Sequence, residues 1–322
     1  MLAGFPVSAQ LKATTKVLLL MGSSFEVTAV SANDTLSWKA INGAIAETRR
    51  IERLISEWDS TSQTTTINRN AGIAPVKVDQ ELFDLISRSI KVSQLTEGAF
   101  DISFAPLMKV WKMNKTMTTL PSASDIETAK SKVGYTKIEL DPGNQTVFLK
   151  EKGMKIGFGG IGQGYVANRC MQLMKNMDIL AGLISVSGDI ITWGKQPDGS
   201  DWRIGIADPR NKSAVISWLS VSNTSLVTSG NYEKFVVIDG NRYGHILDPR
   251  TGLPANGIGS VTIMSPDAEV SDALATGIYV LGIEKGLALI NRLRGIECLI
   301  IDEQGNLHPS KNMMLNFVES KN

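Results

Sequence analysis

Two short stretches far apart in the chain hold residue types whose spacing could support chemistry. The first is a glycine-rich run at 157–164, which follows an apolar run at 154–156 and leads into a helical pattern near Tyr165. A strand, a loop without side chains and a helix N-terminus, in that order, let backbone N–H groups approach an anion closely. This stretch therefore predicts a phosphate-binding loop.

The second stretch covers 271–276, where Asp272 and Thr276 stand four residues apart in a predicted helix. Side chains at this spacing lie on one face, so a carboxylate and a hydroxyl oxygen project together. Such a pair suits Mg²⁺, which takes few protein oxygens and adds substrate phosphates. The spacing alone fits an ordinary helix at least as well, with a carboxylate near its start and a buried threonine.

Other polar positions have a structural interpretation beside the chemical one. His245 lies in a predicted strand, where a histidine with satisfied hydrogen bonds is the commoner case, and the only other histidine, His308, indicates a surface position. These two do not support a two-histidine metal site. The run 228–230 either ends a strand or holds a phosphate. Ser187 lacks the flanking glycines of a hydrolase nucleophile elbow, which argues against a serine hydrolase.

Trp58 stands in a polar stretch that follows the first long helical pattern. A tryptophan in such a loop is either a lid over the core or a stacking surface, and the pattern by itself favours the lid.

The composition bounds the class of protein. The chain has 322 residues, 43% of them apolar, and a formal net charge of +1. These values predict one large domain or two tightly packed ones and give no electrostatic case for nucleic acid. Cys170 and Cys298 are predicted to be buried free thiols. The N-terminal run has no apolar core long enough for a signal sequence or a membrane span, so either the protein is cytosolic or its leader is absent from this chain.

The elements that must position these residues follow from periodicity and turn signals. Strands are predicted at 17–20 and 25–30, helices from about 37 to 55 and at 82–90, and a hairpin at 137–140 and 146–149. Ser124 to Glu127 resembles a capping box. Further strands are predicted at 183–186, 190–193, 202–207, 215–221, 225–228, 235–238, 242–247, 261–264 and 298–301, and a helix at 283–293. Hairpin turns without repeated βαβ units predict an α+β fold with mixed, mostly antiparallel sheets and flanking helices.

Taken in order, eight motifs of this chain resemble those of the ApbE family, the FAD:protein FMN transferases or flavin transferases. They lie at 21–23, 56–58, 98–101, 159–165, 187–190, 228–230, 245–252 and 272–276, and so cover nearly the whole chain. The resemblance implies a single ApbE-like domain over 1–322, related to the T-fold, with two tightly packed subdomains as the alternative.

The resemblance also implies a reaction and a set of site residues. The enzyme would use Mg²⁺ to transfer FMN from FAD to a Ser or Thr hydroxyl of a target protein and would release AMP. The motif positions imply FAD contacts from Met21, Trp58, Ala99, Phe100, Asp101, Gln163, Ser187, Thr228, Ser229 and Ile246, and metal ligands from Asp272, Thr276 and a backbone oxygen of Gly160. Asp272 and His245 would be the catalytic residues, with His245 the candidate for proton transfer.

Four positions depart from the family pattern. Many members carry Asp where this chain has Gly157, Lys or Glu where it has Gln163, Asp at Asn168 and Gly at Ser187. These changes bear on FAD binding more than on the metal site. The departures at Gln163 and Gly157 leave open a flavin-binding protein without turnover. A second alternative is a Mg²⁺-dependent FAD pyrophosphatase that yields FMN and AMP, since the same site lacks only a protein acceptor.

The resemblance implies partners and a location as well. We expect FAD and an acceptor protein, plausibly a subunit of a membrane redox complex. Family members usually act on the outer side of the cytoplasmic membrane, so we expect an exported or periplasmic enzyme whose leader is absent from this chain.

Overall fold

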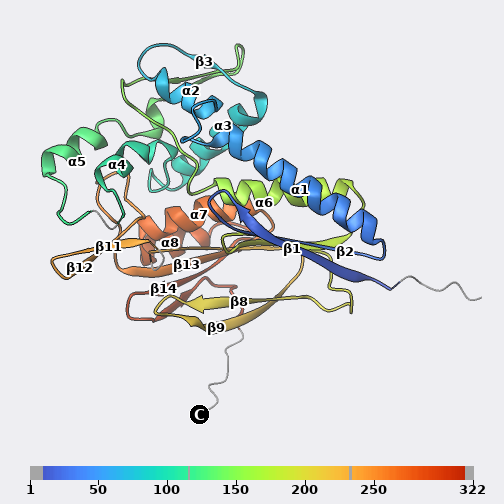
Figure 1. The fold of residues 1–322 in the computed structure, drawn as a ribbon. Helices are drawn as coiled ribbons and strands as arrows, with labels where there is room; N and C mark the ends of the chain where they lie inside the picture. Colours follow the sequence, from blue (N-terminus) through green and yellow to red (C-terminus); the bar gives the residue numbers. More distant parts are fainter. Residues whose placement is uncertain (1–9, 115–116, 232–233, 316–322) are drawn as a thin grey trace, which may run out of the picture.

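The protein is built on one large antiparallel sheet. Its structure, a computed structural model, describes residues 10–114, 117–231 and 234–315 (Figure 1). The sheet has eight strands in the order β1-β2-β6-β7-β10-β13-β14-β15, and every neighbouring pair is antiparallel. The strands are β1 (Lys12–Leu20), β2 (Ser23–Ser31), β6 (Ala181–Val186), β7 (Asp189–Trp193), β10 (Ser225–Gly230), β13 (Ile258–Ser265), β14 (Glu297–Asp302) and β15 (Leu307–Pro309). The expected mostly antiparallel α+β fold is confirmed.

Helices cover one face of this sheet and a hairpin covers the other (Figure 1). The helices are α1 (Asp34–Ile55), α6 (Gly162–Asn176), α7 (Ala268–Leu281) and α8 (Ile283–Ile290), and the hairpin is β8 (Trp202–Asp208) with β9 (Asn211–Val221). Alternation along β2 sends Phe25, Val27 and Ala29 into the helical side and Val30 into the hairpin side. Both faces of the central strands are therefore buried.

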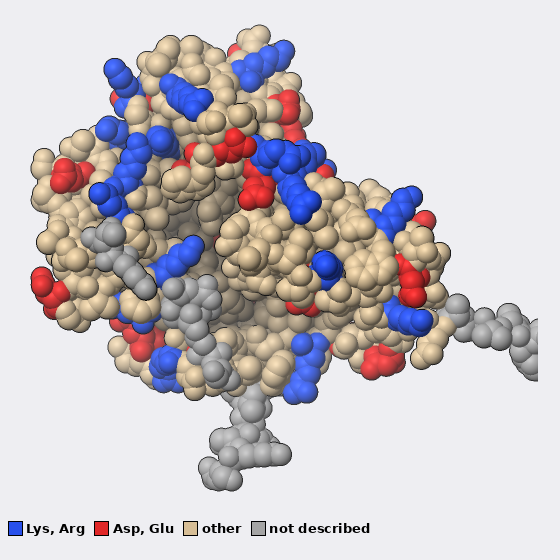
Figure 2. Space-filling view, viewed as in Figure 1, with Lys and Arg blue, Asp and Glu red and all other residues tan. Residues whose placement is uncertain are grey.

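The remaining elements form a layer beyond the helices, at the top and left of Figure 1. They are α2 (Gln63–Arg69), α3 (Gln80–Leu95), α4 (Ala105–Val110), α5 (Ala123–Lys130), the two 3₁₀ turns Ile102–Phe104 and Tyr135–Lys137, the small sheet β3 (Val76–Lys77), β5 (Thr146–Leu149) and β4 (Ile138–Asp141), and the hairpin β11 (Phe235–Ile238) with β12 (Asn241–Gly244). Figure 2 shows a hollow over the region where α4, α6 and α7 come together in Figure 1, with charged side chains of both signs at its rim.

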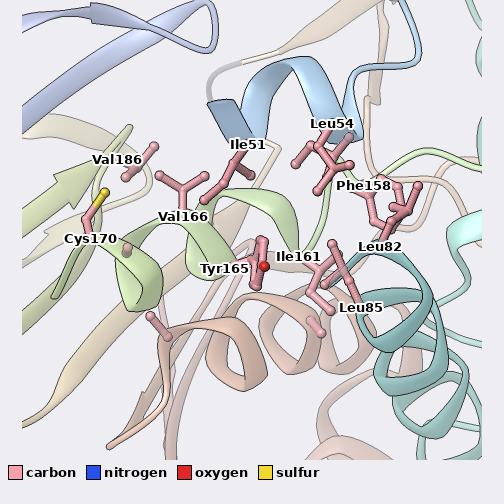
Figure 3. Close-up of a cluster of buried hydrophobic side chains, with 14 of the residues drawn as sticks. Ile51, Leu54, Leu82, Leu85, Phe158, Ile161, Tyr165, Val166, Cys170 and Val186 are labelled. Atoms are coloured by element: carbon pink, nitrogen blue, oxygen red, sulfur yellow. The ribbon is translucent and has the colours of Figure 1, made fainter. Parts of the chain in front are cut away.

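The buried core fixes the glycine-rich run against α1 and α3. Figure 3 shows Phe158 and Ile161 of that run close to Leu82 and Leu85 of α3, and the buried face of α6 close to α1. All four of these side chains are almost fully buried, and each contributes roughly 1.5–3 kcal/mol of apolar burial. The backbone of an otherwise side-chain-free loop is thus held at two apolar anchors.

A polar clasp joins the same three helices. Arg50 of α1 donates two hydrogen bonds of 2.7 Å to the carboxylate of Glu81 on α3. The hydroxyl of Tyr165 on α6 donates to the same carboxylate. Bidentate contacts between charged groups are the stronger kind, so the ion pair ties α1 to α3, and the Tyr165 hydroxyl ties α6 to both.

Several predicted elements agree with the structure. The 137–149 hairpin and the two buried free thiols, Cys170 and Cys298, are confirmed, and burial raises the pKa of the Cys170 thiol to about 12. Asp101 caps the 3₁₀ turn that follows it. Within the described residues, no helix combines the length and apolar character needed to cross a membrane.

Two predictions near the glycine-rich run are wrong. Residues 154–156 form no strand, because the Asn68 side chain accepts a hydrogen bond from the Ile156 N–H at 2.8 Å and donates to its carbonyl at 2.9 Å. The Asn68 side chain thus makes the backbone hydrogen bonds that a neighbouring strand would otherwise make. Helix α6 also begins at Gly162, three residues before Tyr165, so part of the run is helical.

Four further predictions are corrected by local contacts. The polar stretch around Gln63 is helix α2, which Ser62 caps by accepting the Thr65 N–H. Ser122, not Ser124, caps α5. Strand β12 ends at Gly244, so His245 lies just beyond it. His308 is a half-buried strand residue of β15 and lies 3.0 Å from Asp302, not a surface residue.

The ion pair between α3 and α7 yields a testable stability effect. Arg88 donates to both carboxylate oxygens of Glu269 at 2.6 and 3.1 Å, and Glu269 is 7% exposed. Replacing Arg88 with Met leaves that carboxylate without its partner, so we expect the free energy of unfolding to fall by about 1–3 kcal/mol. Burial already raises the pKa of Glu269, so the loss should grow as pH rises above the ordinary carboxyl range and the unpaired group ionises.

Urea unfolding of Arg88→Met measures this loss. The exposed Lys91 on the same helix supplies the control, because Lys91→Met removes the same charge without breaking a described ion pair. Equal losses in both variants would mean that the pair contributes nothing beyond the surface charge.

Candidate active site

Helix α7 presents Thr276 to the glycine-rich run. Asp267 caps this helix by accepting the Val270 N–H at 3.1 Å. A Cβ placed on Gly160 would stand 2.9 Å from the Thr276 hydroxyl oxygen, so only glycine allows this approach. The hydroxyl of Ser229, in β10, lies 3.3 Å from the same oxygen. Three predicted site residues are therefore neighbours although they come from three elements.

Asp272 lies one turn earlier on α7 and points at the start of α6. Its carboxylate accepts the Gly164 N–H at 3.0 Å. A Cβ on Gly164 would stand 2.1 Å from the carbonyl oxygen of Ala268, so this glycine permits the close contact of α6 with α7. The sequence analysis missed that role because it placed Gly164 in the loop before the helix.

The carboxyl group of Asp272 is withdrawn from water. The residue is 5% exposed, and burial raises the pKa of its carboxyl to about 7. The backbone N–H groups of Gly164 and Gln163 oppose this rise, and the charge of Glu269 adds to it. A buried carboxylate supported only by backbone dipoles is suited to a bound cation.

The donor set around this carboxylate fits Mg²⁺. Asp272 and Thr276 offer side-chain oxygens, and Gly160 stands beside Thr276 with its backbone oxygen as a further donor. In the described ranges no group of three or more His, Cys, Asp or Glu could hold a metal. A sparse set of hard oxygen donors, completed by phosphate and water, is what Mg²⁺ takes.

Backbone contacts favour one tautomer of His245. Its Nδ1 lies 3.2 Å from the carbonyl oxygen of Lys234, and its own backbone N–H donates to that oxygen at 3.1 Å. A carbonyl oxygen can only accept, so this contact favours the neutral tautomer that has its proton on Nδ1 and uses Nε2 as the accepting nitrogen. Such a ring can take a proton from a hydroxyl.

Asn231 fixes the backbone around His245, which sequence reasoning did not anticipate. Its side-chain oxygen accepts the Ile246 N–H at 3.0 Å. A Cβ on Gly244 would stand 1.9 Å from Asn231 Cγ, so Gly244 makes room for this amide. One side chain thereby contacts the residues on both sides of His245.

Several predicted FAD contacts gather around α7. Ala99 and Ile246 pack in one buried cluster with Leu274 and Ala275 of α7. Phe100 lies against Gly277 of the same helix, and Gln163 is half-buried in the first turn of α6. Thr228 instead bonds across the sheet, with its hydroxyl 2.9 Å from that of Thr262.

Asp101 uses its carboxylate inside the protein. The carboxylate accepts the N–H and the hydroxyl of Ser103 at 2.8 and 2.7 Å and the N–H of Tyr135 at 2.7 Å. Burial raises the pKa of this group. These contacts make Asp101 the anchor of the 98–101 segment, and its contact with FAD stays a prediction.

Three other predicted positions are at turns. Met21 (φ 52°) and Ser187 (φ 57°) adopt the left-handed conformation in neighbouring turns, where the Ser187 N–H donates to the Ser24 carbonyl at 2.8 Å. Trp58 is 87% exposed. The prediction that Trp58 is a lid over the core is therefore wrong, and the stacking-surface alternative fits its exposure.

The fold and this site place the chain among proteins built like flavin transferases. The structure is similar to that of the ApbE protein of Thermotoga maritima, with a TM-score of 0.87, 31% identity and coverage of 93% of this chain and 97% of that one. It is also similar to the flavinyl transferase ApbE of Pseudomonas stutzeri, with a TM-score of 0.84, 26% identity and coverage of 94% and 96%.

A model of the ApbE family matches residues 21–300, and the chain belongs to this family. A relative from Klebsiella pneumoniae is 31% identical over 93% of this chain and 92% of its own length. One from Treponema pallidum is 32% identical over 78% and 73%. Both are named FAD:protein FMN transferase, which confirms the expected family and the enzyme class, transferase.

The departure at Gln163 gives a prediction about nucleotide affinity. Replacing this half-buried amide with Lys adds a charge at the start of α6, so we expect tighter FAD binding through a charge-assisted contact. The gain should stay below about 1.5–3 kcal/mol because ordering the lysine side chain costs entropy. Turnover should change less than affinity.

Calorimetric FAD titrations with and without Mg²⁺ measure the gain. Gln172→Lys, the same change at an exposed position further along α6, is the control for a general effect of charge. Unchanged or weaker FAD binding in Gln163→Lys would show that this side chain does not reach the ligand.

Proposed function

We propose that this protein transfers FMN from FAD to a Ser or Thr hydroxyl of an acceptor protein, with Mg²⁺, and releases AMP. The observation that carries the proposal is the convergence of Asp272, Thr276 and Gly160 at the start of α6. Family membership and the names of the relatives support flavin transfer, and the oxygen donor set supports Mg²⁺.

The reaction is a displacement at one phosphorus of FAD. The acceptor hydroxyl oxygen bonds to the phosphorus of the FMN half, and the bond from that phosphorus to the bridging oxygen breaks. The bridging oxygen leaves with AMP and keeps the electron pair. When bound, Mg²⁺ neutralises charge on the pyrophosphate and orients it for attack.

Residues of the chain would hold the metal, accept the proton and position the histidine ring. Asp272, Thr276 and Gly160 would hold the metal, and the Ser229 hydroxyl would orient Thr276. His245, with Nε2 as its accepting nitrogen, would take the proton of the attacking hydroxyl. Asn231 would keep the ring in place through the Ile246 N–H.

The family resemblance also supports a proposal for the partner and the location. We propose that the acceptor is a protein with an accessible Ser or Thr, a subunit of a membrane redox complex, and that the enzyme acts outside the cytoplasmic membrane. Both rest on the family resemblance alone.

One incubation separates the proposed function from its alternatives. The protein is mixed with FAD, Mg²⁺ and a purified acceptor domain, and the products are followed by mass spectrometry and chromatography. We expect covalent FMN on the acceptor and one AMP for each FMN attached. Free FMN with AMP would instead identify a pyrophosphatase, and unchanged FAD a binding protein without turnover.

A further inference from the structure

Glu57 places a carboxylate against the first residue of the glycine-rich run. A Cβ on Gly157 would stand 2.8 Å from Glu57 Oε1, 3.1 Å from its Cδ and 3.3 Å from Oε2. The distance to Oε1 is shorter than real Cβ atoms show and the other two are tight, so any residue larger than glycine would have to displace the carboxylate. The Glu57 carboxylate therefore occupies space that is available only because residue 157 has no side chain.

The carboxylate of Glu57 is half withdrawn from water, and none of the described residues donates a hydrogen bond to it. Burial raises the pKa of Glu57, and the charge of Lys155 opposes that rise. Within the described part of the chain, no residue donates a hydrogen bond to this carboxylate or forms an ion pair with it. A desolvated acceptor without a partner costs free energy, and such groups are common where a ligand supplies the partner.

The surroundings hold this carboxylate at the candidate site. The Gly157 N–H donates to the Ile102 carbonyl at 2.8 Å, and the Asn68 amide holds the Ile156 backbone from the other side. The same run continues to Gly160, beside Thr276. Next to Glu57, Trp58 exposes 87% of its surface, enough for an aromatic ring to stack on it.

We propose that the Glu57 carboxylate accepts a hydrogen bond from a donor of FAD and fills the place of the aspartate that many family members carry at 157. FAD offers such donors in its ribityl and ribose hydroxyls, the flavin N3–H and the adenine amino group. The inference rests on the proposed function, because FAD is its ligand. It explains why Gly157 need not weaken FAD binding in this chain.

Titration of FAD without Mg²⁺ tests the inference by binding alone. Glu57→Gln keeps the shape and removes the charge, so we expect FAD affinity to fall about tenfold to a hundredfold. Glu52→Gln, on α1, is the control and should bind like the parent. The same titrations with FMN and with AMP locate the donor, since the loss should follow the half of FAD that Glu57 contacts.

Moving the carboxylate from position 57 to position 157 tests whether the two side chains would occupy the same space. Gly157→Asp alone should bind FAD less tightly than the parent, because two carboxylates compete for one position. Glu57→Ala with Gly157→Asp should restore affinity to within about threefold of the parent, an interaction between neighbouring sites that additive changes cannot give. Circular dichroism of each variant checks folding, and if Gly157→Asp does not fold, the Glu57→Gln titrations still decide.

The outcomes separate this inference from the proposed function. If the parent binds FAD and Glu57→Gln binds it equally well, the inference alone is wrong. The same holds if Gly157→Asp has equal effects with and without Glu57. If the parent binds no FAD, the proposed function fails, and the inference fails with it.

Discussion

Asp272→Ala should lower Mg²⁺-dependent FAD cleavage by about 10³-fold or more while the protein stays folded. The carboxylate is the one charged oxygen among the three proposed metal donors, and a metal that neutralises a pyrophosphate contributes several kcal/mol to the transition state. Rates of FAD cleavage measured over a range of Mg²⁺ concentrations test this. A variant that cleaves FAD at the parental rate at low Mg²⁺ would contradict the assignment.

The stability of Asp272→Asn supplies the control for folding. Burial raises the pKa of the Asp272 carboxyl to about 7, well above the usual value near 4, so its ionisation in the folded protein lowers stability as pH rises between these values. Asn keeps an acceptor for the Gly164 N–H and cannot ionise. In EDTA above pH 7, the Tm of Asp272→Asn should equal or exceed that of the parent. A loss of activity in Asp272→Asn then cannot be ascribed to unfolding.

His245→Ala should slow turnover by roughly 10²–10⁴-fold and leave FAD affinity nearly unchanged. The reason is that, in the proposed function, Nε2 accepts a proton that moves only during the reaction. Single-turnover rates and FAD titrations separate the two quantities. Parallel losses in rate and in binding would make His245 a residue that shapes the pocket instead.

The second histidine of the chain is the matched control. His308 lies in β15 and pairs with Asp302, whose pKa it helps to hold well below the usual value. His308→Ala should therefore leave turnover unchanged, and any effect should be a loss of stability at neutral pH. This stability is present above the ordinary carboxyl pKa and is lost as acid protonates Asp302.

Local patterns predicted the elements that carry the site, because their signals lie within a few residues of each other. The apolar period of α1 and the four-residue spacing of Asp272 and Thr276 are properties of one helix. Short α2 was missed because its buried face consists of Thr64, Thr65 and Ile67, which reads as polar in sequence. The end of β12 at Gly244 was also missed. There the side chain of Asn231 accepts the Ile246 N–H, and the local sequence pattern does not show this contact.

The sequence by itself determined the family, the antiparallel α+β class and which side chains share the face of α7, since these depend on motif order and on the periods of helices and strands. Only the tertiary structure decided how the pieces meet. Gly164 reaches Asp272 across 108 residues, and Asn68 reaches Ile156 across 88. The carboxylate beside Gly157 comes from Glu57, and the amide beside Gly244 comes from Asn231. The space beside a glycine is filled by whichever segment packs there in the folded chain. The residues adjacent to that glycine in sequence do not determine which segment this is.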